Sequence, residues 1–353
     1  MSKGRRIIDV KIDPEKLNKL NRFVLQENFN NKVLEVSKLN LSVIQKPSLG
    51  SITINDSYSA ANSVLDVIGS VRKISLNQIR GQNFSKKIIF GGYDESKFQF
   101  VTLEGVANIT SHSLVEVTNR EYLPVGYITV YFYTRSKAIV DKSEHVRYSL
   151  NADADSNRDY AKDRNHMILE SVLENSILFI DGPFIGGNIT NYSLKLVQSL
   201  HKKNVIPVFF VKNSDSNLVV DNFEPLKTKF NSDLHWSYNF LKPGERTNFF
   251  LYTDKVNPKN RKLFCYFKAF DHTSPQRIEF SPETFDVYES HIEELFDLVY
   301  YLMLVQGDKS NPQIRPVAIA EKYAREMIKT VNIRSMIRNT SLIPTMNQER
   351  FGG

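Results

Sequence analysis

Residues 167–182, with the sequence MILESVLENSILFIDG, decide the fold that we expect for this chain. The first part places Met167, Ile168 and Val172 on one side of a helix, because apolar residues three or four positions apart share a helix face. The segment SILFIDG that follows is a continuous apolar run of strand length, typical of a buried central strand with a charged residue at its carboxyl end. A helix that leads directly into a buried strand indicates an α/β fold.

The same order of elements recurs downstream. Residues 191–204, NYSLKLVQSLHKKN, have the pattern of an amphipathic helix, and residues 205–212, VIPVFFVK, form another apolar run of strand length. Strand, helix and strand in this order predict a parallel crossover. Further strands are expected within residues 248–282, and the apolar patterns of residues 291–306 and 316–338 predict two closing helices.

Upstream of the deciding stretch, the pattern changes twice. From Pro14 to about Leu41 apolar residues recur at helical spacing, so we expect an N-terminal helical segment within residues 1–80. Residues 86–135 are rich in β-branched and aromatic residues separated by turn formers, which predicts three or four antiparallel strands. The polar, acidic residues 151–162 predict a loop before the next helix. The chain as a whole therefore predicts a mixed sheet flanked by helices.

Composition limits the classes of function. A formal net charge of +7 in 353 residues permits a polyanionic partner such as nucleic acid but does not require one. Cys265 is the single cysteine, which excludes an intrachain disulfide and cysteine-based zinc clusters and favours a reducing compartment. No apolar stretch approaches the roughly 18–20 residues of a membrane span, and residues 1–16 lack the apolar region of a secretory signal. We therefore expect a cytoplasmic protein that does not contact a membrane.

Asp181 is the most informative single residue. It ends an apolar strand and is followed at once by Gly182 and Pro183, so its carboxylate would lie in the crevice outside the strand ends, where α/β sheets bind ligands. Asp-Gly pairs also favour turns for purely local reasons. Both interpretations stay open at this point, and we favour the functional one.

Other carboxylates are candidates to join Asp181. Glu170 lies eleven residues earlier on the preceding helix, where a glutamate is more often a solvated surface group. Asp94, in KIIFGGYDES, follows a predicted strand and two glycines, or else belongs to a hairpin turn YDESK. Glu104, in FVTLEGV, is a fallback at an expected strand position. Two carboxylates that converge in a cleft are costly unless a cation offsets their charge, so convergence indicates a metal site.

Several other chemistries find less support in the sequence. The seven histidines show no His-x-His or His-x-x-x-His spacing, which makes a zinc site from adjacent ligands improbable, and carboxylates favour Mg²⁺ or Mn²⁺ instead. The loops GGYDES and FIGGN do not complete a nucleotide-binding pattern, and no Gly-x-Ser-x-Gly elbow is present. Basic residues on and before the last helix, among them Arg315, Lys322 and Arg325, are either phosphate contacts or a solvated helix face.

Four segments of the chain stand in a distinctive order: MILESVLENSILFIDGPF, VIPVFFVKNSDSN, FCYFKAFDHTSPQRIEFSP and PVAIAEKYAREM. No single one is specific, but taken in order they resemble the NurA nuclease family, whose members have a ribonuclease H-like core and resect DNA ends with the hexameric HerA ATPase. The resemblance runs from about Lys86 to Arg325. The resemblance implies a nuclease core over residues 81–330, followed by a tail over residues 331–353.

The family's metal-binding acids correspond to Glu170, Asp181 and Asp94, so the resemblance implies a site for Mn²⁺ or Mg²⁺. It also implies that Glu321 acts as a ligand or water-orienting base, and that Lys212 faces the phosphate. Two departures from the family pattern concern these acids. Gly91 stands where a strict alignment puts the first aspartate, and the Ala-His pair of the closing helix is Ala-Glu here, with the glutamate at position 321.

The resemblance therefore implies a metal-dependent deoxyribonuclease that forms a homodimer and acts with a HerA-type ATPase in DNA end processing or antiviral defence. Arg315, Lys322 and Arg325, together with Lys212, are its expected DNA contacts. The alternative is a catalytically impaired DNA-binding or scaffold subunit of a HerA-type complex, which explains the departures from the family pattern without any chemistry.

Overall fold

The structure, a computed structural model, describes residues 29–38, 58–60, 63–68, 71–118, 121–141, 145–212, 216–308, 311–331 and 342–345. The chain divides into two compact units, Met1–Gly50 and Ser51–Gly353. In the first unit the described part is helix α2 (Phe29–Lys38), which agrees with the helical spacing there. The rest of the helix expected from Pro14 onward lies outside the described residues.

Five strands form the centre of the sheet in the second unit. Strands β4 (Ile89–Val101), β5 (Val106–Thr118) and β6 (Glu121–Thr134) make an antiparallel meander. Strand β8 (Ser176–Asp181) lies parallel to β4 on its other side, and β9 (Ile206–Val211) lies parallel to β8. The resulting order β6-β5-β4-β8-β9, with these directions, is that of the ribonuclease H-like fold, which confirms the expected fold class.

Beyond β9 the sheet continues with antiparallel strands. These are, in order, β13 (Gln276–Phe280), β12 (Arg261–Lys268), β11 (Phe250–Asp254), β2 (Ser63–Val67) and β1 (Tyr58–Ala60). Because β1 and β2 come from the start of this unit, residues that we expected in a helical segment are strands of the main sheet.

Three short strands and several short helices complete the unit. Strand β10 (Glu245–Thr247) pairs with β12 and with β3 (Lys73–Ser75), and β7 (Val146–Tyr148) pairs with the end of β6. The short helical segments are α4 (Lys137–Val140), η2 (Gly187–Ile189), η3 (Val220–Asn222), α7 (Glu224–Lys227), α8 (Asp233–Phe240), α9 (Pro282–Tyr288) and η4 (Glu289–His291).

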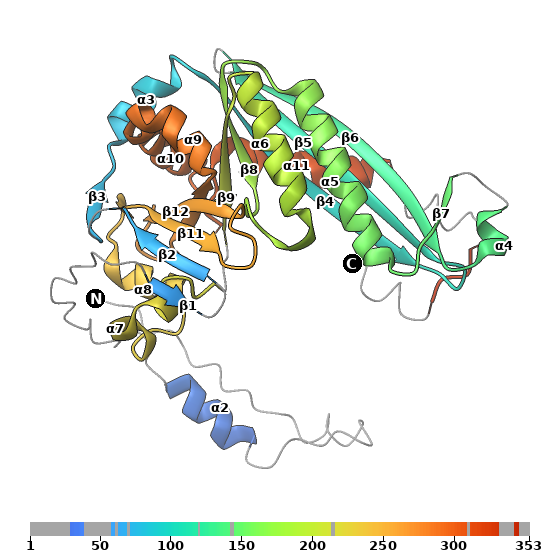
Figure 1. Ribbon diagram of the computed structural model, residues 1–353, viewed down its shortest axis with the longest axis horizontal. Coiled ribbons are helices and arrows are strands. Elements are labelled where there is room, and N and C mark those ends of the chain that lie inside the picture. Colours follow the sequence, from blue (N-terminus) through green and yellow to red (C-terminus); the bar gives the residue numbers. More distant parts are fainter. Residues whose placement is uncertain are drawn as a thin grey trace, which may run out of the picture. The chain divides into compact units, whose positions relative to one another are not determined.

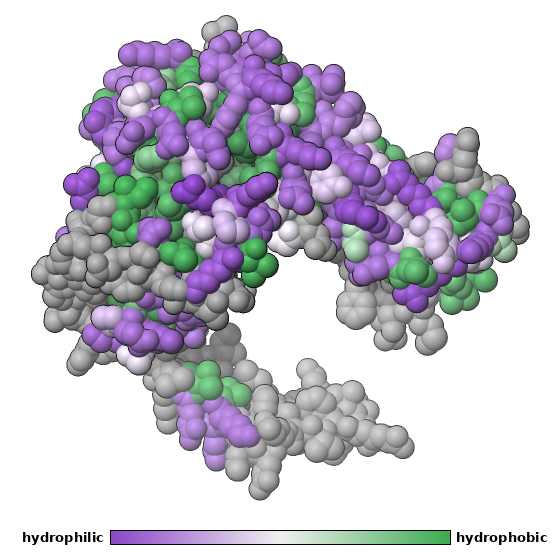
Figure 2. Space-filling view, in the orientation of Figure 1, coloured by the Kyte–Doolittle hydropathy of each residue, from purple (hydrophilic) through white to green (hydrophobic). Residues whose placement is uncertain are grey.

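Long helices cover both faces of the sheet (Figure 1). Helices α5 (Ala152–Ser171) and α6 (Thr190–Lys202) lie side by side on one face, and the outer surface of this layer is mostly hydrophilic (Figure 2). Helices α10 (Ile292–Gln306) and α11 (Arg315–Thr330), with α3 (Gln78–Ser85) against α10, pack on the opposite face. No helix among the described residues is long and apolar enough to cross a membrane.

Alternation along β8 divides the interior into two apolar cores. Ile177 and Phe179 point into the core that contains residues of α10 and α11. Leu178 and Ile180 point into the core that contains residues of α5 and α6. Since successive strand residues point to opposite faces, Asp181 at the end of β8 is directed to the α11 face.

Three local features differ from the sequence-based expectations. Strand β4 runs without interruption through residues 93–97, so the YDESK hairpin is wrong and Asp94 lies within a strand. Glu104, expected on a strand, lies in the turn between β4 and β5. Helix α5 begins at Ala152, with the Asn151 side chain accepting a hydrogen bond from the first helical turn, where we expected a loop. Pairing with neighbouring strands determines the conformation of the β4 segment, and the Asn151 cap determines where α5 begins.

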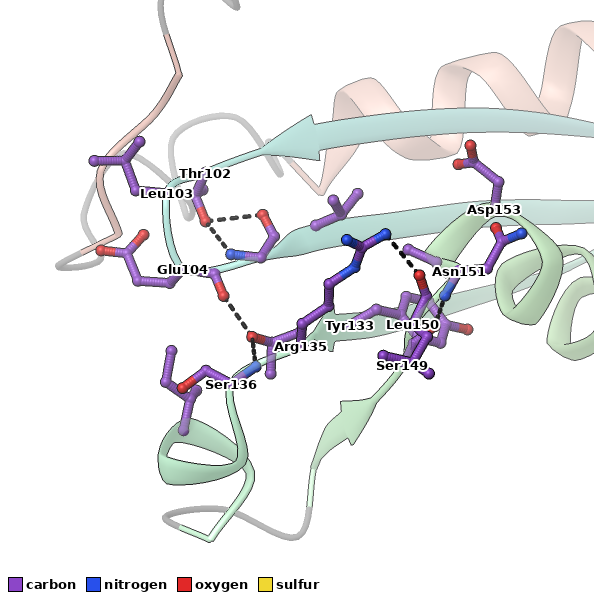
Figure 3. A pocket seen from close by; sticks show the side chains of 15 residues that line it. Thr102, Leu103, Glu104, Tyr133, Arg135, Ser136, Ser149, Leu150, Asn151 and Asp153 are labelled. Atoms are coloured by element: carbon purple, nitrogen blue, oxygen red, sulfur yellow. Dashed lines mark hydrogen bonds between the residues drawn. The ribbon is translucent and has the colours of Figure 1, made fainter.

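The tip of the β4–β5 hairpin carries a cavity of about 920 Å³ and a short piece of the C-terminal region. Figure 3 shows this cavity, where the Arg135 side chain donates a hydrogen bond to the Leu150 carbonyl oxygen. Leu103 N donates to Ile343 O at 2.9 Å, and Thr345 N donates to Val101 O at 3.1 Å. Part of the expected tail is therefore hydrogen-bonded to the core.

Close packing of α11 on β4 leads to a prediction about Gly92. A Cβ atom on Gly92 would lie 2.4 Å from Val317 N and 2.5 Å from the Pro316 carbonyl carbon, which are backbone atoms of α11. Gly92→Ala therefore has to push the helix away, at a cost of about 1–3 kcal/mol for overpacking. We expect a lower urea midpoint for Gly92→Ala, while Gln198→Ala on the outer face of α6 leaves it unchanged. Equal midpoints for both variants would contradict the packing.

Candidate active site

Asp94 and Asp181 lie side by side at the centre of the sheet. The parallel register pairs Tyr93 with Ile180, so the next residue on each strand is an aspartate. Both aspartates follow residues that point to the α5 face, and both are therefore directed to the α11 face. The Asp94 side chain is 7% exposed and that of Asp181 is 24% exposed, so two carboxyl groups share a largely buried place.

Lys212 provides the positive charge between them. It follows the last residue of β9, and its Nζ lies 3.2 Å from Asp181 Oδ2 and 3.6 Å from Asp94 Oδ2. The same Nζ lies 3.3 Å from Glu321 Oε2. One ammonium group thus contacts three carboxyl groups that come from two strands and one helix.

Glu321 reaches this cluster from the middle of α11. The Gln313 side chain donates a hydrogen bond of 2.6 Å to Glu321 Oε2, and the Arg325 guanidinium one helical turn later contacts Oε1. The Glu321 side chain is 15% exposed. Its orientation is therefore fixed from three sides, by an amide and by two cations including Lys212.

The ionisation of these groups is perturbed in different directions. Burial, and then the nearby charge of Asp181, raise the pKa of Asp94 to about 8. Burial also raises the pKa of Asp181, with Lys212 opposing it. Burial opposes ionisation of Glu321 too, but the Gln313 hydrogen bond and the Lys212 and Arg325 charges lower its pKa overall. A second cation at this place would favour the ionised form of both aspartates.

Glu170 does not join this cluster, which corrects the expected ligand set. Helix α5 packs Met167 and Ile168 into the core on the opposite face of the sheet from Asp181 and Glu321. Glu170 itself is exposed to solvent on that helix. Its helix also leads into the start of β8, whereas Asp181 lies at the end of β8. The strand and the sheet therefore separate the two carboxylates that the resemblance had paired.

One acidic residue near the cluster was missed in the sequence. Glu95 follows Asp94 on β4 and points to the α5 face, 3.6 Å from Lys97 Nζ. Its negative charge contributes to the raised pKa of Asp94 and of Asp181. The residue was hidden by the hairpin interpretation of YDESK, since a turn glutamate would be solvated. On this face α5 presents a buried arginine, Arg164.

The predicted basic residues divide between two places. Lys322 and Arg325 line a cavity of about 290 Å³ together with Glu321, which puts both beside the carboxylate cluster. Arg315, six residues before Glu321, lines a different cavity of about 1130 Å³. There its Nη1 donates to the Val305 carbonyl oxygen and its guanidinium lies over the Tyr122 ring.

The donor set suits a hard divalent cation once Lys212 moves. Asp94 Oδ2 is buried without a hydrogen-bond partner, and Asp94, Asp181 and Glu321 offer carboxyl oxygens, which are ligands that Mg²⁺ and Mn²⁺ prefer. As the described residues stand, no three acidic, histidine or cysteine side chains form a ready metal site. Lys212 takes the position between the carboxylates.

Comparison with known proteins identifies the family of the chain. The NurA domain model matches residues 62–325, and the chain belongs to the NurA family, a family of nucleases. No curated protein matches the sequence. The match starts at residue 62, earlier than the expected start of the core at residue 81, and it includes strands β2 and β3.

Among solved structures, the chain is similar to the NurA nuclease from Sulfolobus solfataricus, with 10% identity over 94% of this chain and 99% of that one, at a TM-score of 0.46. It is also similar to endonuclease V from Bacillus subtilis, with 10% identity over 72% of this chain and 91% of that one, at a TM-score of 0.37. It is similar as well to A. aeolicus Argonaute, with 12% identity over 73% of this chain and 30% of that one, at a TM-score of 0.30. These identities and scores are low, so the family assignment rests on the sequence match.

The shared burial of the aspartates leads to a pH prediction for Asp94→Asn. The pKa of an aspartate is about 4 in an unfolded chain, whereas burial raises the pKa of Asp94 to about 8 in the folded protein. The folded state binds more protons in this window, so the free energy of unfolding falls as the pH rises. Asparagine cannot ionise and escapes this loss. In metal-free buffer we therefore expect the stability of the variant relative to the wild type to increase with pH. The increase from pH 5 to pH 8 should be on the order of 2 kcal/mol.

Thermal unfolding in EDTA-treated buffer at both pH values measures this difference. A gain of the same size at pH 5 and at pH 8 would show that Asp94 ionises normally in the folded protein.

Proposed function

We propose that this protein is a divalent-metal-dependent deoxyribonuclease whose active site is the cluster of Asp94, Asp181 and Glu321. The single observation that carries the proposal is the convergence of these three carboxyl groups on one point, 3.2 to 3.6 Å from Lys212 Nζ. Burying like charges together is costly, and proteins retain such clusters where a cation is bound and used. Membership of a nuclease family supports the same conclusion.

Each residue then has a defined task. Asp94, Asp181 and Glu321 would hold Mg²⁺ or Mn²⁺, which supplies an activated water and stabilises charge on the phosphate. Gln313 keeps Glu321 in place through its 2.6 Å hydrogen bond, so this carboxylate needs little rearrangement. Lys212 offers a cation to the scissile phosphate, and Lys322 and Arg325 attract the neighbouring DNA phosphates from the adjoining cavity.

A non-catalytic DNA-binding or scaffold role is the second candidate. One observation favours it, namely that Lys212 already neutralises the cluster and leaves no ready metal site among the described residues. A lysine in that position stabilises a buried acidic cluster without any catalysis. Cleavage and metal binding by the purified protein separate the two candidates.

The wider setting is proposed from the family resemblance. We propose that the protein acts with a HerA-type hexameric ATPase in DNA end processing or antiviral defence. Co-purification of the two proteins tests this partnership directly. If the ATPase neither binds the protein nor alters its action on DNA, the partnership is wrong while the nuclease proposal is untouched.

We also propose that two copies associate through β6. Strand β7 pairs with β6 at residues 132–134, and no other described strand covers the remaining edge of β6. Leu123, Val125 and Tyr127 are each at least 40% exposed on one face of that strand. An open, apolar strand edge favours pairing with another chain.

Val125→Lys places a charge between the exposed residues Leu123 and Tyr127, and should convert a dimer into a monomer. Light scattering at micromolar concentration measures the mass, and Lys195→Ala on the outer face of α6 is the control that should stay dimeric. A wild-type monomer, or a Val125→Lys dimer, would rule out this interface.

Asp181→Asn tests the nuclease proposal. The variant keeps the size and shape of the side chain but loses the charge that holds the metal, so Mn²⁺- or Mg²⁺-dependent DNA cleavage should fall by two or more orders of magnitude. Cleavage of labelled linear and single-stranded DNA measures the effect. Glu170→Gln is the matched control and should retain activity, because Glu170 lies on the opposite face of the sheet. Loss of activity in Glu170→Gln, with Asp181→Asn active, would reverse the assignment.

A further inference from the structure

Lys212 is the most unusual part of the cluster. Its ammonium contacts all three carboxyl groups, and its side chain is 22% exposed, so one end of it is accessible to solvent. The backbone beside it is well fixed, because the preceding residue, Val211, pairs with Arg277 of β13. The side chain beyond Cα has four methylene groups, so the ammonium moves several ångströms without any change in the backbone.

More carboxyl groups than basic side chains meet at this point. Three carboxyl groups face one lysine, while Arg325 contacts the outer oxygen of Glu321. Asp94 Oδ2 is buried without a hydrogen bond, and Lys212 Nζ approaches it only to 3.6 Å. A compact divalent cation would satisfy this oxygen and carry twice the charge of the ammonium, so lysine is a weaker occupant of the same position.

We propose that Lys212 is an exchangeable counter-ion, which fills the metal position in the metal-free protein and leaves it when a divalent cation binds. This rests on the proposed nuclease function. The displaced ammonium is then free to contact a DNA phosphate at the same site. Lys212 is therefore a positioning residue that couples two binding events.

Coupling of this kind is reciprocal. A metal that expels Lys212 makes the ammonium available to DNA, and DNA that draws the ammonium away opens the carboxylates to the metal. Each ligand must then raise the affinity for the other by the same factor. The protein would load metal mainly when a phosphate backbone is present.

The test compares Mn²⁺ affinity in the wild type and in Lys212→Met, measured by calorimetry and by the electron paramagnetic resonance signal of free Mn²⁺. Methionine keeps a similar length and removes the charge. We expect Lys212→Met to bind Mn²⁺ at least tenfold more tightly than the wild type. Addition of a non-cleavable phosphorothioate oligonucleotide should tighten Mn²⁺ binding in the wild type and leave it unchanged in the variant.

Two further variants guard the interpretation. Lys195→Met, on the outer face of α6, should leave Mn²⁺ affinity within about twofold, because it removes a charge of the same sign on the opposite face of the sheet from the three carboxyl groups. Lys212→Arg keeps the charge and should keep Mn²⁺ binding weak. Circular dichroism and thermal unfolding of each variant confirm that it is folded.

The outcomes separate this inference from the proposed function. If folded Lys212→Met binds Mn²⁺ no more tightly than the wild type, Lys212 is not an exchangeable counter-ion. The nuclease proposal still stands in that case, provided that Asp181→Asn loses metal-dependent cleavage. If Asp181→Asn binds Mn²⁺ as tightly as the wild type, the metal site itself is wrong, and both proposals fail.

Discussion

The pairing of β4 with β8 is the constraint on which the rest of the site depends. A parallel register that places Tyr93 beside Ile180 makes the next residues, Asp94 and Asp181, neighbours in a largely buried place. Two ionised carboxyl groups on neighbouring strands repel each other, and desolvation penalises their charges further. The fold therefore needs a cation there, and it has Lys212 at the end of the adjoining strand β9. The position of the cluster follows from backbone hydrogen bonds, whereas its charge balance depends on what occupies its centre.

Helix α11 completes the site because it approaches β4 unusually closely. Gly92, two residues before Asp94, leaves no room for even one methyl group beneath Pro316 and Val317. With the helix seated there, Glu321 lies slightly more than one turn beyond Val317 and reaches Lys212. The glycine in GGYDES is thus a packing residue, and it serves the site by fixing the distance between a strand and a helix.

The sequence predicted the apolar strands β8 and β9, the helices between and after them, and the place of Asp181 at the end of a strand, because those signals are local and periodic. Asp94, Glu321 and Lys212 were named too, although the resemblance supplied their roles. The strands β1, β2 and β3 escaped prediction because short strands gain their stability from pairing with distant residues, here with β10 and β11. Gln313 was missed because its neighbours are set by tertiary contacts, and Glu95 was hidden by the hairpin interpretation of YDESK.

Glu170 shows most clearly why order along the chain does not determine a site. The segment MILESVLENSILFID places a glutamate eleven residues before an aspartate, and in one dimension the two are natural partners. In the fold, the helix packs on one face of the sheet while the aspartate at the end of β8 points to the other. A shift of one residue along the strand reverses the face to which a side chain points. Glu321, far away in sequence, takes the place beside Asp181 because its helix lies on the correct side. Which carboxylates meet is thus decided by the period of two along a strand and by the side of the sheet that each helix covers.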